Sequence, residues 1–182
     1  MGYDLAGKVM ESVTGKSIFR LFHEYLYEPL GMKNTFHDWD LGYSVHSTAY
    51  NLAILAQMIL NKGTYDGKKY FSEETFDEIL PKDLKKYFPK LVFSNPWDEN
   101  RPRGIGTTMQ EWEINNEETG NNRYLLSENV IGHGSATSSV FRIDLDNGII
   151  ITQSRRKGNS KFGKHFLEVY KLIDKNLVLK ND

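Results

Sequence analysis

The stretch that decides the fold runs Ile131-Gly132-His133-Gly134-Ser135-Ala136-Thr137-Ser138-Ser139-Val140-Phe141-Arg142-Ile143-Asp144. It begins with tiny residues around one histidine and continues with alternating apolar and polar positions, which are typical of a β-strand. Asp146-Asn147-Gly148 follows, and an Asn-Gly pair is a strong signal for a hairpin turn. The pattern predicts a hairpin formed by Thr137–Ile143 and Ile149–Gln153.

The tiny residues beside His133 favour a function at this end of the strand. A substrate can lie against main-chain N–H groups where side chains are small, and such groups stabilise a developing oxyanion. A tight glycine turn beside a surface histidine explains the same residues equally well, because short motifs often match by chance. The stretch alone leaves both interpretations open.

The composition sets the class of protein. The chain has 182 residues, of which 39% are hydrophobic and 26% charged, and this predicts one globular domain over residues 1–182. A net charge of -1, without a basic stripe, argues against nucleic acid as a partner. The longest apolar run, Leu52 to Leu60, is shorter than the roughly 20 residues that span a bilayer. The chain contains no cysteine, so a thiol nucleophile and a disulfide framework are excluded and the redox compartment stays undetermined.

The N-terminal residues predict a helix and not a signal peptide. They lack a basic region followed by an apolar region, so the sequence does not identify a compartment. A helical period begins at once, and Gly15 ends it. Its apolar face consists of Leu5, Ala6, Val9, Met10 and Val13. Because this helix would begin without a cap or a lead-in, we expect the chain to be part of a longer polypeptide.

Three further helices are predicted in the first half of the chain. They begin at Ser17, at Ser47 or Thr48, and at Ser72, whose hydroxyls can cap a helix, and they end before Pro29, Asn61 and Pro81. No histidine follows His23 four residues later, which excludes a zinc-protease helix. Between the helices, Phe36 and Trp39 are interpreted as core anchors.

The second half is predicted to form strands. Lys82 to Arg103 is interpreted as a long loop, Ile105–Ile114 and Arg123–Val130 as two strands, and Asn115–Asn122 as the polar turn between them. The last helix would cover the sheet with Phe162, Phe166, Val169, Tyr170 and Ile173. Helices, then an antiparallel sheet of three to four strands, then a C-terminal helix give an α+β fold.

Several blocks of sequence, in one order, resemble a known family. The first blocks are Gly2-Tyr3-Asp4-Leu5-Ala6-Gly7, Val13-Thr14-Gly15-Lys16-Ser17 and Glu28-Pro29-Leu30-Gly31-Met32. The later ones are Ser47-Thr48-Ala49, Asn51-Leu52-Ala53, Gln57-Met58-Ile59-Leu60-Asn61, Phe71-Ser72 and His133-Gly134-Ser135. Together they resemble the serine β-lactamase and penicillin-binding-protein-like family, class C branch, over nearly the whole chain, with Lys82 to Asn129 as the weakest part.

The resemblance implies a nucleophile that this sequence does not contain. In the family, a serine of a Ser-x-x-Lys motif forms an acyl-enzyme, assisted by its lysine and by the tyrosine of a Tyr-x-Asn motif. The first block resembles the segment that follows that tyrosine, so Tyr3 is not assigned its role. Ser154-Arg155-Arg156-Lys157 has the Ser-x-x-Lys spacing but follows a strand, and we interpret it as coincidence. The resemblance therefore implies a C-terminal part of the family's fold, without its N-terminal part.

The third motif of the family supplies the candidate site residues. By resemblance, His133 replaces a lysine and polarises the tyrosine hydroxyl or holds an anionic substrate group. Gly134 follows it, Ser135 stands where the family usually has glycine, and the Ala136 N–H is an oxyanion donor. His46 is a weaker candidate that flanks the site. His37 and His165 receive no role, and neither a metal nor a cofactor is implied.

Two functional hypotheses remain open. The chain is part of a serine hydrolase acting on an ester, a β-lactam or a D-amino-acid peptide, or it is a catalytically inactive binding module that keeps the groove. The substrate cannot be identified, because loops and pocket shape determine it. By resemblance, the strand at Ile149–Gln153 would pair with strands that are missing here. We therefore expect the chain to self-associate or to pair with the missing N-terminal segment.

Overall fold

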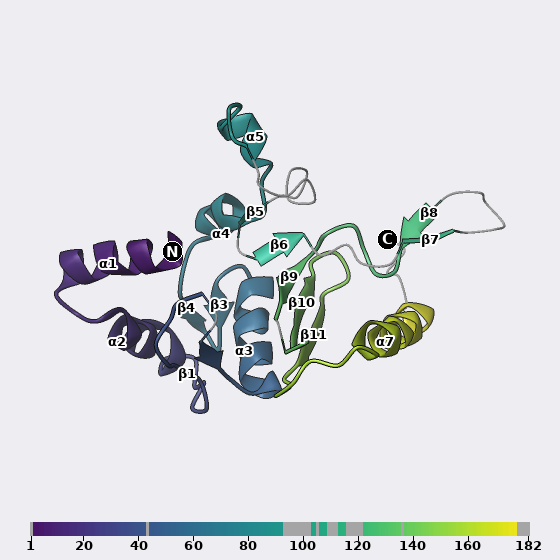
Figure 1. Cartoon of the computed structure of the whole chain (residues 1–182), viewed down its shortest axis with the longest axis horizontal. Helices are drawn as coiled ribbons and strands as arrows, with labels where there is room; N and C mark the ends of the chain where they lie inside the picture. The colour runs from purple at the N-terminus through teal and green to yellow at the C-terminus, as the bar shows by residue number, and fades with distance from the viewer. Residues whose placement is uncertain are drawn as a thin grey trace.

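A central antiparallel sheet separates two helical layers in the computed structural model (Figure 1). The described residues are 2–42, 44–92, 103–104, 106–108, 113–115, 122–135 and 137–177. Helix α3, Ala49–Leu60, packs against strands β10 and β11 on one face. Helix α7, Phe162–Asn176, covers the other face with Phe166 and Tyr170.

The helices of the first half begin where the sequence predicts. Side-chain oxygens of Ser17, Thr48 and Ser72 each accept a hydrogen bond from the N–H three residues later, at 3.3, 3.1 and 3.1 Å. These bonds satisfy N–H groups that a helix leaves unpaired at its start. The three capped helices are α2 Ile18–Phe22, α3 and α4 Glu73–Ile79. A further short helix, α5, is Leu84–Tyr87.

Helix α1, Gly2–Thr14, forms as predicted, but its apolar face is uncovered. Leu5 is 69% and Val13 80% exposed, and Gly7 is the buried residue of the helix. The face of α1 that carries Gly7 lies against the side chains of Leu41 and Ile18. The apolar face of the helix therefore points away from these two residues. None of the described segments covers this face.

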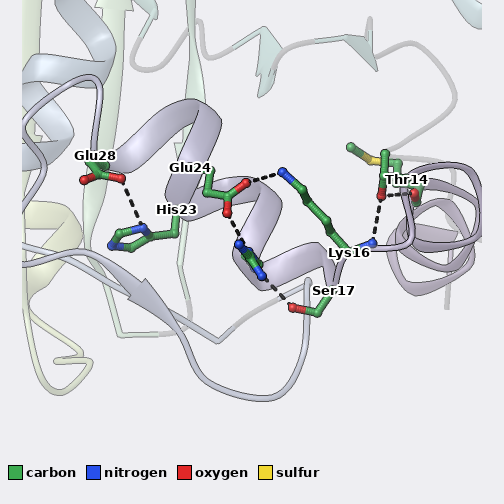
Figure 2. A network of polar contacts seen from close by, with 8 residues as sticks. Thr14, Lys16, Ser17, His23, Glu24 and Glu28 are labelled. Carbon is green, nitrogen blue, oxygen red and sulfur yellow. Dashed lines mark hydrogen bonds and ion pairs between the residues drawn. The ribbon is translucent and has the colours of Figure 1, made fainter.

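A network of charges joins the turn that follows α1 to α2 and to the π-helical turn that follows α2 (Figure 2). Glu24 accepts hydrogen bonds from Lys16 Nζ at 2.6 Å and Arg20 Nε at 2.5 Å. Bonding to Lys16, and then to Arg20, holds the pKa of the Glu24 carboxyl below its ordinary value. The predicted second helix continues beyond α2 as a π-helical turn, His23–Tyr27, in which the Glu28 N–H donates to the His23 carbonyl at 3.0 Å.

The sheet confirms the α+β class and contains five strands where three or four were predicted. The strand order is β11-β10-β9-β6-β5. Their bounds are β5 Arg103–Gly104, β6 Gly106–Thr108, β9 Val130–Gly134, β10 Val140–Asp144 and β11 Ile149–Gln153. In this order β11 is an edge strand, paired along one side by β10.

The predicted hairpin is confirmed as β10 and β11, with Asp144 opposite Ile149. It begins at Val140 and not at Thr137, and Gly148 closes its turn at φ 67°, a backbone conformation that favours glycine. The predicted strand Arg123–Val130 is divided between two elements. Its start belongs to β8, Asn122–Tyr124, which pairs with β7, Glu113–Asn115, and its last residue begins β9.

Smaller elements complete the chain. Two short hairpins are β1 Phe36–His37 with β2 Val45–His46, and β3 Thr64–Tyr65 with β4 Lys68–Lys69. Phe36 is 56% and Trp39 67% exposed, so their interpretation as core anchors is wrong. The predicted loop from Lys82 to Arg103 contains α5, and its residues 93–102 lie outside the described residues.

The side chains of the sheet alternate between two separate hydrophobic clusters. Ile131 and Ile143 belong to the cluster on the α3 side, whereas Val130 and Val140 belong to the cluster on the α7 side. Asp144, only 1% exposed, accepts hydrogen bonds from the Ser127 hydroxyl at 2.6 Å and from the Asn147 side-chain amide at 2.8 Å. This buried carboxylate fixes the hairpin turn against the segment that leads into β9.

Candidate functional site

The candidate motif lies where the middle strand β9 emerges from the core. Val130, Ile131 and Gly132 are buried, whereas His133 and Gly134 are exposed. His133 is opposite Phe141, and Gly134 is opposite Val140, in the neighbouring strand β10. Two hydrogen-bonded neighbours, β10 and β6, therefore hold the strand that presents His133.

His133 projects toward the helical first half of the chain. Alternate residues of a strand share a face, so His133 lies on the same side as Ile131, which packs in the α3-side cluster. In the next strand, β10, Phe141 lies opposite His133, and in β11 Thr152 lies opposite Phe141. The Thr152 hydroxyl donates to the Ala49 carbonyl at 2.8 Å, so this row ends at the start of α3.

The hydroxyl of Ser135 is used within its own loop. Its oxygen accepts hydrogen bonds from the N–H groups of Thr137 and Ser139, both at 3.2 Å. The Ser135 carbonyl accepts from the N–H of Ser138, whose φ of 60° is uncommon for a residue with a side chain. These contacts give the loop after the motif a defined turn. Ala136, the candidate oxyanion donor, lies outside the described residues.

His46 ends β2, shortly before α3 begins, and the neighbouring Ser47 carbonyl accepts a hydrogen bond from Ser154, which follows β11. Its imidazole stacks on Phe36 at 4.8 Å and is 3.9 Å from Asp38. Strand β10 lies between β9 and β11, and two strand spacings separate β9 from β11 by roughly 10 Å. None of the hydrogen bonds or ring contacts of the described residues joins His46 to His133. The structure therefore places His46 at the flank of the helix and does not bring the two histidines together.

Ser154, the serine with Ser-x-x-Lys spacing, tethers a helix. Its hydroxyl donates to the Ser47 carbonyl at 3.1 Å, just before α3 begins. Residues 154–159 form no helix, so Lys157 does not lie one helical turn from Ser154. This geometry agrees with our interpretation of the spacing as coincidence.

Other possible sites lie apart from His133. A hollow of about 330 Å³ lies at the π-helical turn and is lined in part by His23, Tyr27 and Lys33, but by none of the candidate site residues. His23 there is 3.7 Å from Glu28 (Figure 2). Within the described segments, no group of three His, Asp or Glu side chains converges to hold a metal. Across the same segments, no helix has the length and apolar character that a membrane span requires.

His37, which received no role from the sequence, lies in a cage of aromatic rings. Its ring is 4.5 Å from Phe22, 5.7 Å from Tyr27 and 5.8 Å from Phe19. The Tyr27 hydroxyl is 2.8 Å from His37 Nδ1. Burial raises the pKa of Tyr27, so its hydroxyl keeps a proton to donate, and burial lowers the pKa of His37.

We therefore expect acid to destabilise the fold through His37. Burial disfavours the protonated imidazole in the folded state and lowers its pKa, whereas the unfolded chain protonates it near the ordinary pKa of 6.5. The unfolded state then binds more protons, so the free energy of unfolding falls as pH drops below about 6.5. Urea titrations between pH 5 and 8 measure this slope. The slope should decrease in His37→Gln and stay unchanged in His165→Gln, a change at an exposed position of α7. An equal slope in the parent chain and in His37→Gln would contradict the assignment.

One residue beside the motif was missed by the sequence analysis. Arg142 lies in β10 between apolar residues and is buried, with a guanidinium nitrogen 2.7 Å from the His133 carbonyl oxygen. A charged residue in the interior of a predicted core strand was the available signal, because such residues are seldom buried without partners.

One comparison with known proteins identifies a family. A family profile described as Beta-lactamase matches residues 1–161. A search of curated proteins gives no match.

Solved structures share the fold at low sequence identity. A beta-lactamase from Mycobacterium bovis aligns with a TM-score of 0.64 and 18% identity, over 96% of this chain and 60% of the other. The simvastatin synthase LovD from Aspergillus terreus aligns with a TM-score of 0.63 and 15% identity, over 95% of this chain and 53% of the other. The chain thus spans little more than half the length of these two structures.

Proposed function

The chain belongs to the beta-lactamase family, and on this premise we propose that it forms part of a serine hydrolase that works through an acyl-enzyme. The observation that carries the proposal is the position of His133-Gly134-Ser135 at the exposed end of the middle strand, facing the helical half. A nucleophile held on that side would meet an imidazole and the main-chain N–H groups that follow it. Aligned donors of this kind stabilise the charge that develops during acyl transfer.

The proposed roles follow the family's third motif. His133 polarises the hydroxyl of the family's Tyr-x-Asn tyrosine or holds an anionic group of the substrate, and its exposure leaves the ring free to approach either. Gly134 adds no side chain beside His133, and Ser135 fixes the loop by accepting two N–H hydrogen bonds. The N–H of Ala136 is one oxyanion donor, and the N–H of the missing serine is the other. His46 has the weaker role of contacting the substrate from the flank.

The substrate class we propose is an acyl compound, namely an ester, a β-lactam or a D-amino-acid peptide. All three present a carbonyl that a serine can attack, and the donors beside His133 would act on each in the same way. The second candidate, a binding module without catalysis, is supported by the sequence itself. It contains no Tyr-x-Asn, and its one Ser-x-x-Lys spacing begins at the tether Ser154.

We also propose that another polypeptide covers two surfaces of the chain, either a segment that corresponds to the N-terminal part of the family's fold or a second copy. Strand β11 is an edge strand of the sheet that the described residues form, and α1 exposes its apolar face. Open edges and apolar faces favour association. Sedimentation at micromolar concentration should detect self-association that an added N-terminal segment suppresses. A monomer at all concentrations would exclude the second copy as occupant.

The purified chain should not hydrolyse ester or β-lactam reporters above the background rate. Aligned donors without a positioned nucleophile lack the covalent route. The measurement is reporter hydrolysis together with the intact mass of the chain after exposure to a fluorophosphonate. The Ser154→Ala variant is the matched control, because Ser154 carries the one Ser-x-x-Lys spacing. Stoichiometric acylation of any serine of this chain would overturn the proposal that the chain lacks the nucleophile. Labelling that is lost in Ser154→Ala would identify Ser154 as the nucleophile.

A further inference from the structure

A buried cation contacts the main chain of the candidate motif. Arg142, in β10, is 5% exposed. Its side chain lies on the α7 side of the sheet, because it alternates with Phe141 and Ile143, which pack on the α3 side. Its Nη1 donates to the His133 carbonyl at 2.7 Å and to the Phe141 carbonyl at 3.0 Å. The cation thus reaches the backbone of His133 from the face opposite the imidazole.

Gly132 leaves the space that this contact needs. A Cβ at Gly132 would lie 2.0 Å from the Phe141 carbonyl oxygen and 3.1 Å from Arg142 Cδ. Both distances are shorter than ordinary van der Waals contact, and the first involves backbone that cannot swing aside. The missing side chain at Gly132 and the buried arginine at position 142 therefore belong to one arrangement.

The contact fixes more than one oxygen atom. A peptide unit is planar, so holding the His133 carbonyl also holds the direction of the Gly134 N–H. A hydrogen bond from a charged donor is about twice as strong as one between neutral groups, and burial protects it from screening by salt. Arg142 thereby restrains, from the α7 side of the sheet, the main chain that enters the loop of Ser135.

We propose that Arg142 is a positioning residue for the candidate site. Its guanidinium orients the His133–Gly134 peptide, and with it the imidazole and the N–H groups that follow. The geometry alone supports this orientation of the His133–Gly134 peptide. Its importance for catalysis rests on the proposed hydrolase function. Arg142 acts through the backbone of His133 and does not itself meet the substrate.

The test compares Arg142→Met with Arg142→Lys in the 182-residue chain. Methionine keeps much of the length and removes every donor, whereas lysine keeps the charge and one donor group. Amide hydrogen exchange and NMR resonances are measured for His133, Gly134 and Ser135, with Ile150 and Ile151 of β11 as internal references. Arg155→Met is the matched control, because Arg155 is also on the α7 side but stacks on Phe162 at 5.1 Å.

In Arg142→Met we expect exchange at His133, Gly134 and Ser135 to become about tenfold faster, because a local contact that restrains opening is lost. The His133 ring resonances should shift, and the β11 amides should keep their protection. Arg142→Lys should restore part of the slow exchange and part of the original ring resonances. Arg155→Met should change neither the exchange at His133 to Ser135 nor the His133 ring resonances. If Arg142→Met does not fold, the same measurements compare Arg142→Lys with Arg155→Lys.

Two results would overturn the proposal. One is unchanged exchange and unchanged resonances at His133 to Ser135 in the Arg142 variant that folds. The other is an equal change in the Arg142 and Arg155 variants. Because these readouts need no catalysis, they are independent of the hydrolase proposal. A local change in a protein without acyl transfer would leave Arg142 as a positioning residue and refute the enzyme function alone.

Discussion

Gly132→Ala should lower the free energy of unfolding by about 3 kcal/mol, because the new methyl group has no space in the sheet. It would lie 2.0 Å from the Phe141 carbonyl oxygen, which belongs to the paired backbone of β10. Relief requires β9 and β10 to separate, and this would also disturb the Arg142 contact to His133. The effect is large because Gly132 is buried in the middle of the five-stranded order.

Gly134→Ala provides the matched control for this prediction. It adds the same methyl group two residues later in the same strand, where no atom lies within 4 Å of the new Cβ. Urea denaturation of both variants should show a large loss for Gly132→Ala and a change within about 0.5 kcal/mol for Gly134→Ala. Equal losses in the two variants would mean that β9 does not approach β10 as described.

The second large effect is expected for His133→Ala in a longer polypeptide that supplies the nucleophile. Acylation should slow about 100-fold, the lower part of the range for a group that moves a proton or stabilises charge at the reacting centre. The melting temperature should stay nearly constant, because the imidazole is exposed and the strand is held by its backbone. His133→Lys should retain part of the rate, since by resemblance the family has a lysine at this position of the motif.

His165→Ala serves as the control for that experiment. His165 is exposed on α7, on the face of the sheet opposite His133, and should leave acylation unchanged. Stopped-flow acylation and thermal melting are measured on the same preparations. Loss of the fold in His133→Ala with an undiminished rate in the remaining folded protein would make His133 a structural residue.

Local patterns predicted the longer helices and the hairpin of β10 and β11 correctly. The capping hydroxyls of Ser17, Thr48 and Ser72 and the Asn147-Gly148 turn act over a few residues, so the sequence contains their full physical cause. The hairpin of β10 and β11 followed from alternation and that turn. The family resemblance came from blocks in the same regions, and the profile match confirms it.

Contacts between distant segments could not be predicted. The pairing of β6 with β9 joins Thr107 to Gly132, and no local pattern specifies such a partner. The apolar period of α1 predicted its helix but not its exposure, because periodicity indicates which side is apolar and not what covers it. Phe36 was misassigned for a related reason: it stacks on His46 at the surface, where an aromatic pair needs no core.

The sequence named the candidate site residues but did not indicate their arrangement. The sequence indicated His133 and the tiny residues beside it through a motif. It did not reveal that Ser135 accepts two N–H groups of its own loop or that Arg142 holds the His133 carbonyl. Both contacts depend on how the strand ends and on which face each residue occupies.

The most direct test of the central claim is to locate the acyl group. The coding sequence, together with the reading frame that precedes Met1, is expressed, treated with a fluorophosphonate and analysed by peptide mass spectrometry. Our account predicts one labelled serine, the first residue of a Ser-x-x-Lys motif N-terminal to residue 1, with slower labelling in His133→Ala. An in-frame stop immediately before Met1, or labelling of a serine within residues 1–182, would contradict it.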